Sequence, residues 1–284
     1  MIGYALLLPS LFLFLLFYLY PIVYSFYLSF YEWDLVTPAR PVGLGNYREL
    51  FRSSEFLDTI GTTVKFSGGV VLLTMIIGLL LALFLNNRTK LAAFLRACIF
   101  TSYVVSWVAV SLLWIWLLDP QYGLISYLFR LVGLAPVNWL GDHRIALLSL
   151  VLVTVWKIIG YAMIIFLAGL QSINQDYYEA TALDGATVWQ QFRYITWPLL
   201  VPTTVFLLIT LTITSFQGFD IVKIMTQGGP VYSTTIYVYY VYEQAFNFFK
   251  LGKASAAVTI FFNLILLLTL FQYIYLRRKL SNGA

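Results

Sequence analysis

Long stretches without a charged side chain are the feature that most constrains this chain. The first 31 residues contain none, and residues 66–87 and 97–118 form further uncharged runs. An α-helix needs about 20 consecutive apolar residues to cross the hydrocarbon layer of a bilayer. Because several runs reach that length, the chain is expected to cross a membrane several times.

The composition supports the same interpretation. Hydrophobic residues make up 61% of the 284 residues, charged residues make up 10%, and the mean hydropathy is +0.85. Soluble domains carry about 25% charged residues. These values exclude an ordinary soluble enzyme, a disordered chain and a disulfide scaffold.

The uncharged runs predict an all-α integral membrane protein with six transmembrane helices in a single membrane domain, residues 1–284. The expected helices span residues 4–30, 66–87, 97–118, 145–170, 199–219 and 254–276. Residues 224–242 are also uncharged, but Gly228-Gly229-Pro230 would break a helix there. Lipid cannot pair the freed backbone groups, so this run is not predicted to cross, and its tyrosines suit an interfacial segment.

Basic residues give only a weak indication of orientation. If the amino terminus is cytoplasmic, the basic residues divide almost evenly between the two sides of the membrane. The inner clusters Arg88-x-Lys90 and Arg277-Arg278-Lys279 are short and dense, whereas the outer loops are longer and more acidic. Density of Lys and Arg in short loops marks the cytoplasmic side, so both termini are predicted to be cytoplasmic.

The segment between the fourth and fifth predicted helices, residues 171–198, is the longest polar stretch on the predicted cytoplasmic side. Asp176 is expected to cap a short helix, with Glu179 reaching back in a capping box. Gly185 supplies a left-handed stop, and a second helical stretch follows over residues 188–196. The segment is therefore predicted to project from the membrane as a compact knob.

Two motifs carry a family resemblance. Residues 179–186, Glu-Ala-Thr-Ala-Leu-Asp-Gly-Ala, followed by Pro198, resemble the EAA loop of binding-protein-dependent ABC importer permeases. Residues 215–234, with Ser-Phe-x-x-Phe-Asp and then Met-Thr-x-Gly-Gly-Pro, resemble the carbohydrate permeases of that family. Within them the chain is similar to the first permease subunit of maltose, lactose and glycerol-3-phosphate importers.

The resemblance implies a permease in a prokaryotic plasma (inner) membrane that translocates a sugar. Its implied partners are a second homologous permease, two ATPase subunits and an extracellular or periplasmic solute-binding protein. The chain has no Walker A loop, because Gly252-Lys253-Ala254 lacks the upstream Gly and the following Ser or Thr. ATP and Mg are therefore expected on the ATPase partners, with no cofactor in this chain.

The loop resemblance implies that residues Glu179, Ala180, Asp184 and Gly185 couple the permease to an ATPase. The docked helix would transmit closure of the ATPase dimer to the membrane helices. Glu179 also suits a purely structural role as a helix-capping carboxylate. The two roles are compatible, because a rigid projection needs a helix whose ends are capped.

Several polar side chains within the predicted helices are candidates for the substrate path. Lys157 lies near the middle of a predicted membrane helix, where an ionisable group is expensive, and Tyr161 follows one turn later. The alternative is that Lys157 pairs with a carboxylate or carbonyl inside the helix bundle. The resemblance adds Ser215 and Gln217, and Asn263 is a weaker candidate; helix–helix hydrogen bonding is the alternative for such residues.

Other functions remain open at this stage. The cargo could be a polyol, glycerol phosphate or oligopeptide, and hydropathy alone also allows an ion-gradient transporter. An integral membrane enzyme would need clustered carboxylates, histidines or a nucleophile, whereas the acidic residues here are dispersed among loops. His143 is the only histidine, so no multi-histidine metal site is predicted. No catalytic residue is predicted either. The scattered basic residues do not indicate nucleic-acid binding.

Overall fold

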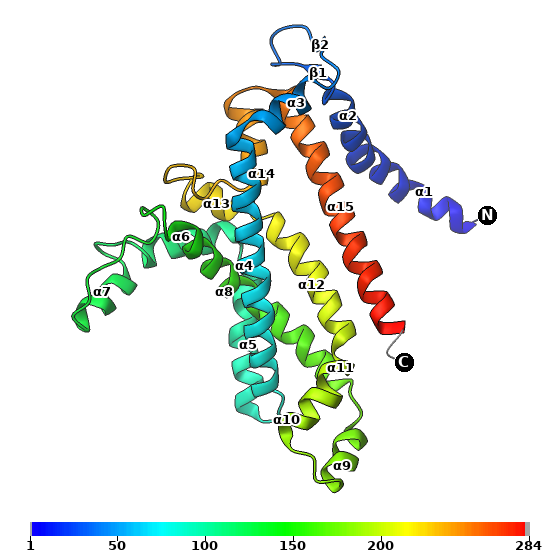
Figure 1. Cartoon of the computed structure of the whole chain (residues 1–284), viewed down its shortest axis with the longest axis vertical. Helices are drawn as coiled ribbons and strands as arrows, with labels where there is room; N and C mark the ends of the chain where they lie inside the picture. Colours follow the sequence, from blue (N-terminus) through cyan, green and yellow to red (C-terminus); the bar gives the residue numbers. More distant parts are fainter. Residues whose placement is uncertain (1, 282–284) are drawn as a thin grey trace. The chain divides into compact units, whose positions relative to one another are not determined.

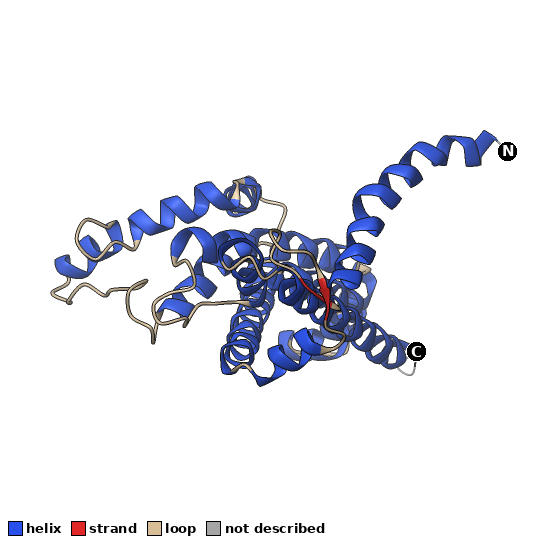
Figure 2. Cartoon of the chain, turned by 90° about the horizontal axis from the view of Figure 1, so that it is seen from above, coloured by secondary structure: helices blue, strands red, loops and turns tan. Residues whose placement is uncertain are grey.

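The computed structural model describes residues 2–281, with side chains over residues 7–274, and it divides into two compact units. Unit 1 consists of residues 1–61 and 237–268, and unit 2 consists of residues 62–236 and 269–284. Two boundaries fall inside the helices α4 (Ser54–Phe84) and α15 (Leu251–Ser281), which both units share, and the third precedes Tyr237. Helices account for most of the described chain (Figures 1 and 2).

Unit 1 begins with a bent membrane helix and continues into a small polar cap. Besides parts of α4 and α15, it contains α1 (Ile2–Phe14), η1 (Leu15–Leu19), α2 (Tyr20–Leu28), β1 (Tyr31–Glu32), β2 (Arg40–Pro41), α3 (Gly45–Arg52), α14 (Tyr237–Tyr242) and η3 (Glu243–Asn247). The π-helical turn η1 lies just before Pro21, which has no N–H to continue a regular ladder. Strands β1 and β2 pair antiparallel, with Glu32 opposite Arg40 (Figure 2).

Aromatic side chains build the core of unit 1. Phe56 and Tyr240 are fully buried, and their ring centroids lie 5.6 Å apart. Tyr237 packs edge-on against Phe56, and its hydroxyl donates a hydrogen bond to the Ala257 carbonyl at 2.8 Å. Tyr237, Tyr239 and Tyr240 are buried within the protein, and the interfacial position that the sequence predicts for their segment stays a prediction.

Unit 2 is organised around α8 (Ala146–Gln171), whose residues are mostly buried. The other elements are α5 (Lys90–Val104), α6 (Trp107–Leu117), α7 (Leu124–Leu131), α9 (Gln175–Leu183), α10 (Val188–Gln191), η2 (Phe192–Thr196), α11 (Trp197–Leu199), α12 (Val201–Phe216) and α13 (Phe219–Met225). Gly160 lets α5 approach closely, because a Cβ there would lie 2.6 Å from the Ile99 carbonyl oxygen. Close approach of small residues is a common way to pack helices within a membrane.

Five described helical segments are long and apolar enough to cross a membrane: residues 7–28, 54–84, 146–171, 201–225 and 251–274. The helix predicted over 97–118 is not continuous, which corrects the sequence prediction. It consists of α5 and α6, which meet at a 102° bend, and it gives a sixth crossing only if the bent pair spans the membrane. Val105 and Ser106 have extended backbones, and Ser106 caps α6 by accepting a hydrogen bond from the Ala109 N–H.

Two other segments differ in detail from the sequence prediction. The second membrane helix begins at Ser54 rather than near residue 66, because α4 continues without a break from a polar first stretch that contains Glu55, Asp58 and Lys65. Among the described residues, no helix lies between Met225 and Tyr237, where Gly229-Pro230 is a cis peptide bond. The basic cluster at residues 277–279 lies outside the described side chains.

Candidate functional site

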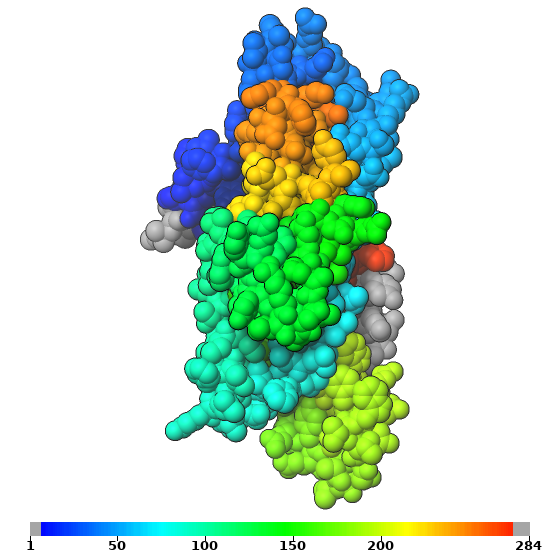
Figure 3. All heavy atoms as spheres, turned by 90° about the vertical axis from the view of Figure 1, so that its left-hand side faces the viewer, coloured from blue at the N-terminus to red at the C-terminus, as the bar shows by residue number. Residues whose placement is uncertain are grey.

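The loop between α8 and α12 forms a compact projection at one end of unit 2. It lies at the same end as the turn between α4 and α5, and it forms a separate lobe in the space-filling view (Figures 1 and 3). Arg88 lies in that turn and Lys90 begins α5, and the sequence assigns this basic pair to the same side of the membrane as the projection. The two segments predicted to be cytoplasmic therefore lie together within unit 2.

Hydrogen bonds fix the shape of this projection. Asn174, rather than Asp176, caps α9 by accepting a hydrogen bond from the Asp176 N–H at 3.1 Å. The reason is that α9 begins one residue before Asp176, at Gln175, so Asp176 lies inside the first turn. The capping box occurs instead at the start of α10, between Thr187 and Gln190.

Gly185 ends α9 in the left-handed conformation that the sequence predicts, with φ of +76°. The Ala186 N–H donates to the Thr181 carbonyl at 3.0 Å, and the Gly185 N–H donates to the Ala182 carbonyl at 3.1 Å. This pair of bonds is a Schellman motif, which reverses the chain after a helix. The Thr181 hydroxyl accepts a hydrogen bond from the Gln191 amide at 3.3 Å, so the turn is held against α10.

The projection presents exposed apolar side chains although it lies in a polar loop. Leu183 is 91% exposed and Val188 is 83% exposed, and Trp189 is also exposed. The same projection contains a groove of about 290 Å³, which is lined by Asp184, Gly185 and residues of α10 and η2. Clustered exposed apolar groups with a polar rim mark a surface that binds another protein.

A second cluster lies inside the membrane helices of unit 2. The Lys157 side chain is buried, and its ammonium donates a hydrogen bond to the Tyr103 carbonyl at the end of α5. The ammonium also lies 5.3 Å from the Tyr103 ring centroid and 5.2 Å from that of Trp107. Tyr161 stacks on Tyr103 with ring centroids 5.1 Å apart. The structure therefore brings Lys157 and Tyr161 together around the break between α5 and α6.

The remaining predicted path residues lie elsewhere. Ser215 is buried, and its hydroxyl donates to the Thr212 carbonyl of its own helix at 2.8 Å. Gln217 is exposed at the end of α12. Asn263 belongs to unit 1, where its amide donates to the Thr259 carbonyl at 2.8 Å. Their place on a substrate path stays a prediction.

Comparison with known proteins identifies the family. Residues 74–281 match the model of the binding-protein-dependent transport system inner membrane component. The chain is 35% identical to the trehalose/maltose transport system permease protein MalF of Thermococcus litoralis, over 97% of this chain and 92% of that protein.

The chain belongs to this family of permeases. It is also 33% identical to the sn-glycerol-3-phosphate transport system permease protein UgpA of Pectobacterium atrosepticum, over 99% of this chain and 95% of that protein. A crystal structure of a bacterial alginate ABC transporter in complex with an alginate pentasaccharide-bound periplasmic protein contains a similar chain. The TM-score is 0.87 at 26% identity, and the match covers 98% of this chain and 95% of that chain.

Membership settles the broad role of the protein. The permease is a membrane-spanning translocation subunit of an ABC importer and not an enzyme, and ATP hydrolysis belongs to a separate chain. Permeases of this family work with a second permease, with ATPases and with a binding protein.

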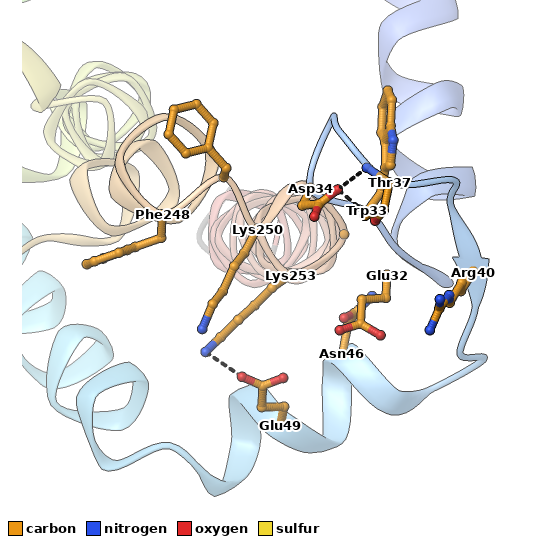
Figure 4. A pocket seen from close by; sticks show the side chains of 12 residues that line it. Glu32, Trp33, Asp34, Thr37, Arg40, Asn46, Glu49, Phe248, Lys250 and Lys253 are labelled. Carbon is orange, nitrogen blue, oxygen red and sulfur yellow. Dashed lines mark hydrogen bonds and ion pairs between the residues drawn. The ribbon is translucent and has the colours of Figure 1, made fainter.

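The permease also contains a polar pocket in unit 1, of about 450 Å³, between the β1–β2 loop, α3 and the start of α15 (Figure 4). Lys253 donates to Glu49 at 2.9 Å, and Figure 4 shows the Lys250 side chain extending beside that of Lys253. Two hydrogen bonds from Thr37, one from its backbone N–H and one from its hydroxyl, lower the pKa of Asp34. The ionised carboxylate holds the loop together by accepting them. The sequence prediction did not single out this pocket.

The sequence also missed Tyr103 and Trp107 beside Lys157, and Leu183, Val188 and Trp189 on the loop. Leu183 lies within the EAA motif, and Val188 and Trp189 follow it, so all three could have been recognised as apolar side chains in a polar segment. The two aromatic residues gave no such signal, because aromatic residues are common throughout the membrane helices.

Proposed function

We propose that this permease imports a sugar through a path lined in part by the Tyr103–Tyr161 aromatic pair. The support is threefold: the maltose and glycerol-3-phosphate systems named for its relatives, the alginate system of its structural neighbour, and the stacked rings within the membrane helices. Aromatic faces carry partial negative charge, which suits the C–H faces of a sugar ring. Polyols and glycerol phosphate are the nearest alternative cargoes.

The proposed arrangement has both termini and the α9–α10 projection in the cytoplasm. In this orientation the projection meets an ATPase subunit, and ATP and Mg are bound there rather than by this chain. Ser215, Gln217 and Asn263 are retained as candidates for the path, although the first hydroxyl is already bonded within its own helix.

One observation carries the coupling proposal: a rigid, capped helix that ends in a left-handed turn and presents exposed apolar side chains. Glu179, Ala180, Asp184 and Gly185 are all exposed on this projection. A coupling element must transmit force without unfolding locally, so it must be rigid. The hydrogen bonds of the Schellman motif and the Thr181–Gln191 contact provide this rigidity. The capping box predicted between Asp176 and Glu179 does not form at the start of α9, and the exposed Glu179 carboxylate can therefore meet an external partner.

Gly185→Val tests the coupling proposal. A β-branched residue is strongly disfavoured at positive φ, so the turn should distort while membrane insertion continues. In proteoliposomes with the full importer, uptake of maltose, trehalose or glycerol 3-phosphate per ATP hydrolysed should fall about tenfold, the factor that 1.4 kcal/mol represents.

Gly133→Val is the matched control. Gly133 has the same φ of +76° and, like Gly185, nothing within 4 Å of an added Cβ, but it lies in the loop between α7 and α8. It should retain normal coupling. Equal losses in both variants would indicate general backbone strain, and normal coupling in Gly185→Val would refute the role of the projection.

The pocket of unit 1 lies between loops that are outer loops in the proposed orientation, and we propose that it forms part of the surface that meets the binding protein. Its described contacts satisfy Asp34 and Glu49, whereas the structure describes no hydrogen bond or ion pair for the Lys250 ammonium. Phe248 and Phe249 are both 53% exposed at its edge. An exposed cation beside exposed aromatic rings suits an acidic, partly apolar protein surface.

Reversing the charge of Lys250 tests this contact. Lys250→Glu should weaken binding of the binding protein to the importer in nanodiscs by about tenfold, mainly through slower association that depends on salt. Lys90→Glu, an equal charge reversal at the exposed start of α5, should leave the affinity unchanged. Unchanged affinity in Lys250→Glu would exclude this pocket from the contact surface.

A further inference from the structure

The break between α5 and α6 leaves a backbone carbonyl that must find a partner inside the membrane. Regular α5 ends at Val104, and Val105 and Ser106 are extended. The Tyr103 carbonyl therefore has no N–H of a following helical turn from which to accept a hydrogen bond. An unpaired carbonyl in a lipid-embedded region is costly. The Lys157 ammonium donates a hydrogen bond to this carbonyl, and so replaces the missing turn.

The same ammonium touches both sides of the break. Its distances to the ring centroids of Tyr103, on α5, and Trp107, on α6, are 5.3 Å and 5.2 Å. Both distances are within the range of a cation–π contact, which is strongest for a desolvated cation. The Lys157 side chain is only 3% exposed, so it is shielded from water at this position.

The geometry of Tyr103 is thereby connected to that of Tyr161. Tyr161 lies one helical turn after Lys157 on α8, and its ring stacks on Tyr103 at an interplanar angle of 21°. Gly160, between them, allows the α5 backbone to lie directly against α8. Lys157 therefore holds the backbone that carries one ring, while its own helix carries the other.

We propose that Lys157 is a positioning residue: it fixes the α5–α6 corner and so orients the Tyr103–Tyr161 pair, without itself binding the cargo. This inference rests on the proposed function, in which that pair contacts the sugar. Its ammonium is already occupied by a carbonyl and two rings, so it is not a receptor for an anionic cargo. The competing role, direct binding of a phosphate or carboxylate on the cargo, predicts different results.

Uptake by proteoliposomes separates the two roles. Lys157→Met removes the hydrogen bond without adding a charge to the membrane, so the chain should still insert. Uptake should fall about tenfold, the equivalent of 1.4 kcal/mol, and by the same factor for neutral maltose or trehalose and for anionic glycerol 3-phosphate. Lys157→Arg, which keeps a cationic donor, should retain more uptake than Lys157→Met.

A double variant tests whether Lys157 acts through Tyr103. If it does, Lys157→Met should add little to the loss caused by Tyr103→Ala, because both changes remove the same oriented ring. Additive losses would overturn the proposal. Selective loss of glycerol 3-phosphate uptake in Lys157→Met would also overturn it and would assign the ammonium to the cargo.

A measurement without cargo distinguishes failure of this inference from failure of the proposed function. In a Cys98→Ser background, a nitroxide on Val105→Cys reports the corner, and one on Leu80→Cys reports α4; these positions are 40% and 59% exposed. Lys157→Met should increase the mobility of the label at position 105 about twofold or more and leave that at position 80 unchanged. Lys157→Arg should return the mobility at position 105 toward that of the protein with Lys157.

Unchanged mobility at position 105, or equal mobilisation of both labels, would overturn the positioning role. The second result would indicate general loosening of the unit. If the wild-type importer takes up none of the three probes, the result tells against the proposed cargo class, while the spin labels still decide the role of Lys157.

Discussion

At the scale of single residues, the close backbone approach of α5 to α8 in unit 2 depends on the absence of a side chain. A Cβ at Gly160 would lie 2.6 Å from the Ile99 carbonyl oxygen and 2.8 Å from the Phe100 Cα. Gly160→Ala must therefore separate α5 from α8 and disturb the corner that Lys157 holds. We expect destabilisation of about 1–3 kcal/mol, as for other overpacked sites, measured by denaturation of the purified importer in mixed micelles.

The control for Gly160→Ala is Gly68→Ala. Gly68 lies within the membrane helix α4, and nothing lies within 4 Å of its built Cβ. Because Ala has the higher helix propensity, this variant should be neutral or slightly more stable than the wild type. A similar loss of stability in both variants would show that the α5–α8 contact is not the cause of the loss.

Residue chemistry marked Lys157 as constrained, either on the substrate path or by pairing inside the helix bundle, but it did not identify a partner. A charge in an otherwise apolar helix signals a constraint by itself, because burying it alone is expensive. Its partner is a carbonyl 54 positions away along the chain, freed by a bend in another helix. Since backbone carbonyls are present at every residue, no side-chain pattern could identify Tyr103, and the carbonyl pairing remained one of two open alternatives.

At the scale of elements, sequence reasoning worked where a break has a local chemical cause. Gly228-Gly229-Pro230 predicted the absence of a crossing near residues 224–242, and Gly185 predicted a left-handed helix end; both features are present. The α5–α6 break has no Gly or Pro, and uncharged residues continue across it. The available signal was Ser106 before an apolar run, a helix-capping residue that also occurs frequently inside membrane helices.

Helix starts were less predictable than helix ends in the projecting loop. Asn174 and Asp176 are both good capping residues, and the pattern Asp176-x-x-Glu179 fits a capping box. The structure selects Asn174, whose side chain bonds both the Asp176 backbone and the Asp176 carboxylate. Since both residues are good helix caps and lie two positions apart, the local sequence does not decide between them.

At the scale of the whole molecule, the question is whether the bent α5–α6 pair crosses the membrane. Along the chain, three candidate crossings separate the β1–β2 loop from the α9–α10 projection: α4, the bent pair and α8. Three crossings place the two loops on opposite sides, whereas two crossings place them on the same side. The orientation that coupling requires therefore depends on this one pair of helices.

Cysteine labelling can decide the point. In a Cys98→Ser background, Val36→Cys and Leu183→Cys occupy sites that are 88% and 91% exposed, where substitutions usually change stability by less than about 0.5 kcal/mol. A membrane-impermeant maleimide should label only position 36 when it is added to cells from which any outer membrane or wall has been removed. The same reagent should label only position 183 when it is added to inside-out membrane vesicles. Labelling of both positions from one side would mean that α5 and α6 do not together span the bilayer, since a corner of 102° can also return the chain to its starting face. The reverse pattern would keep the crossing but place the projection outside, where no ATPase could drive it.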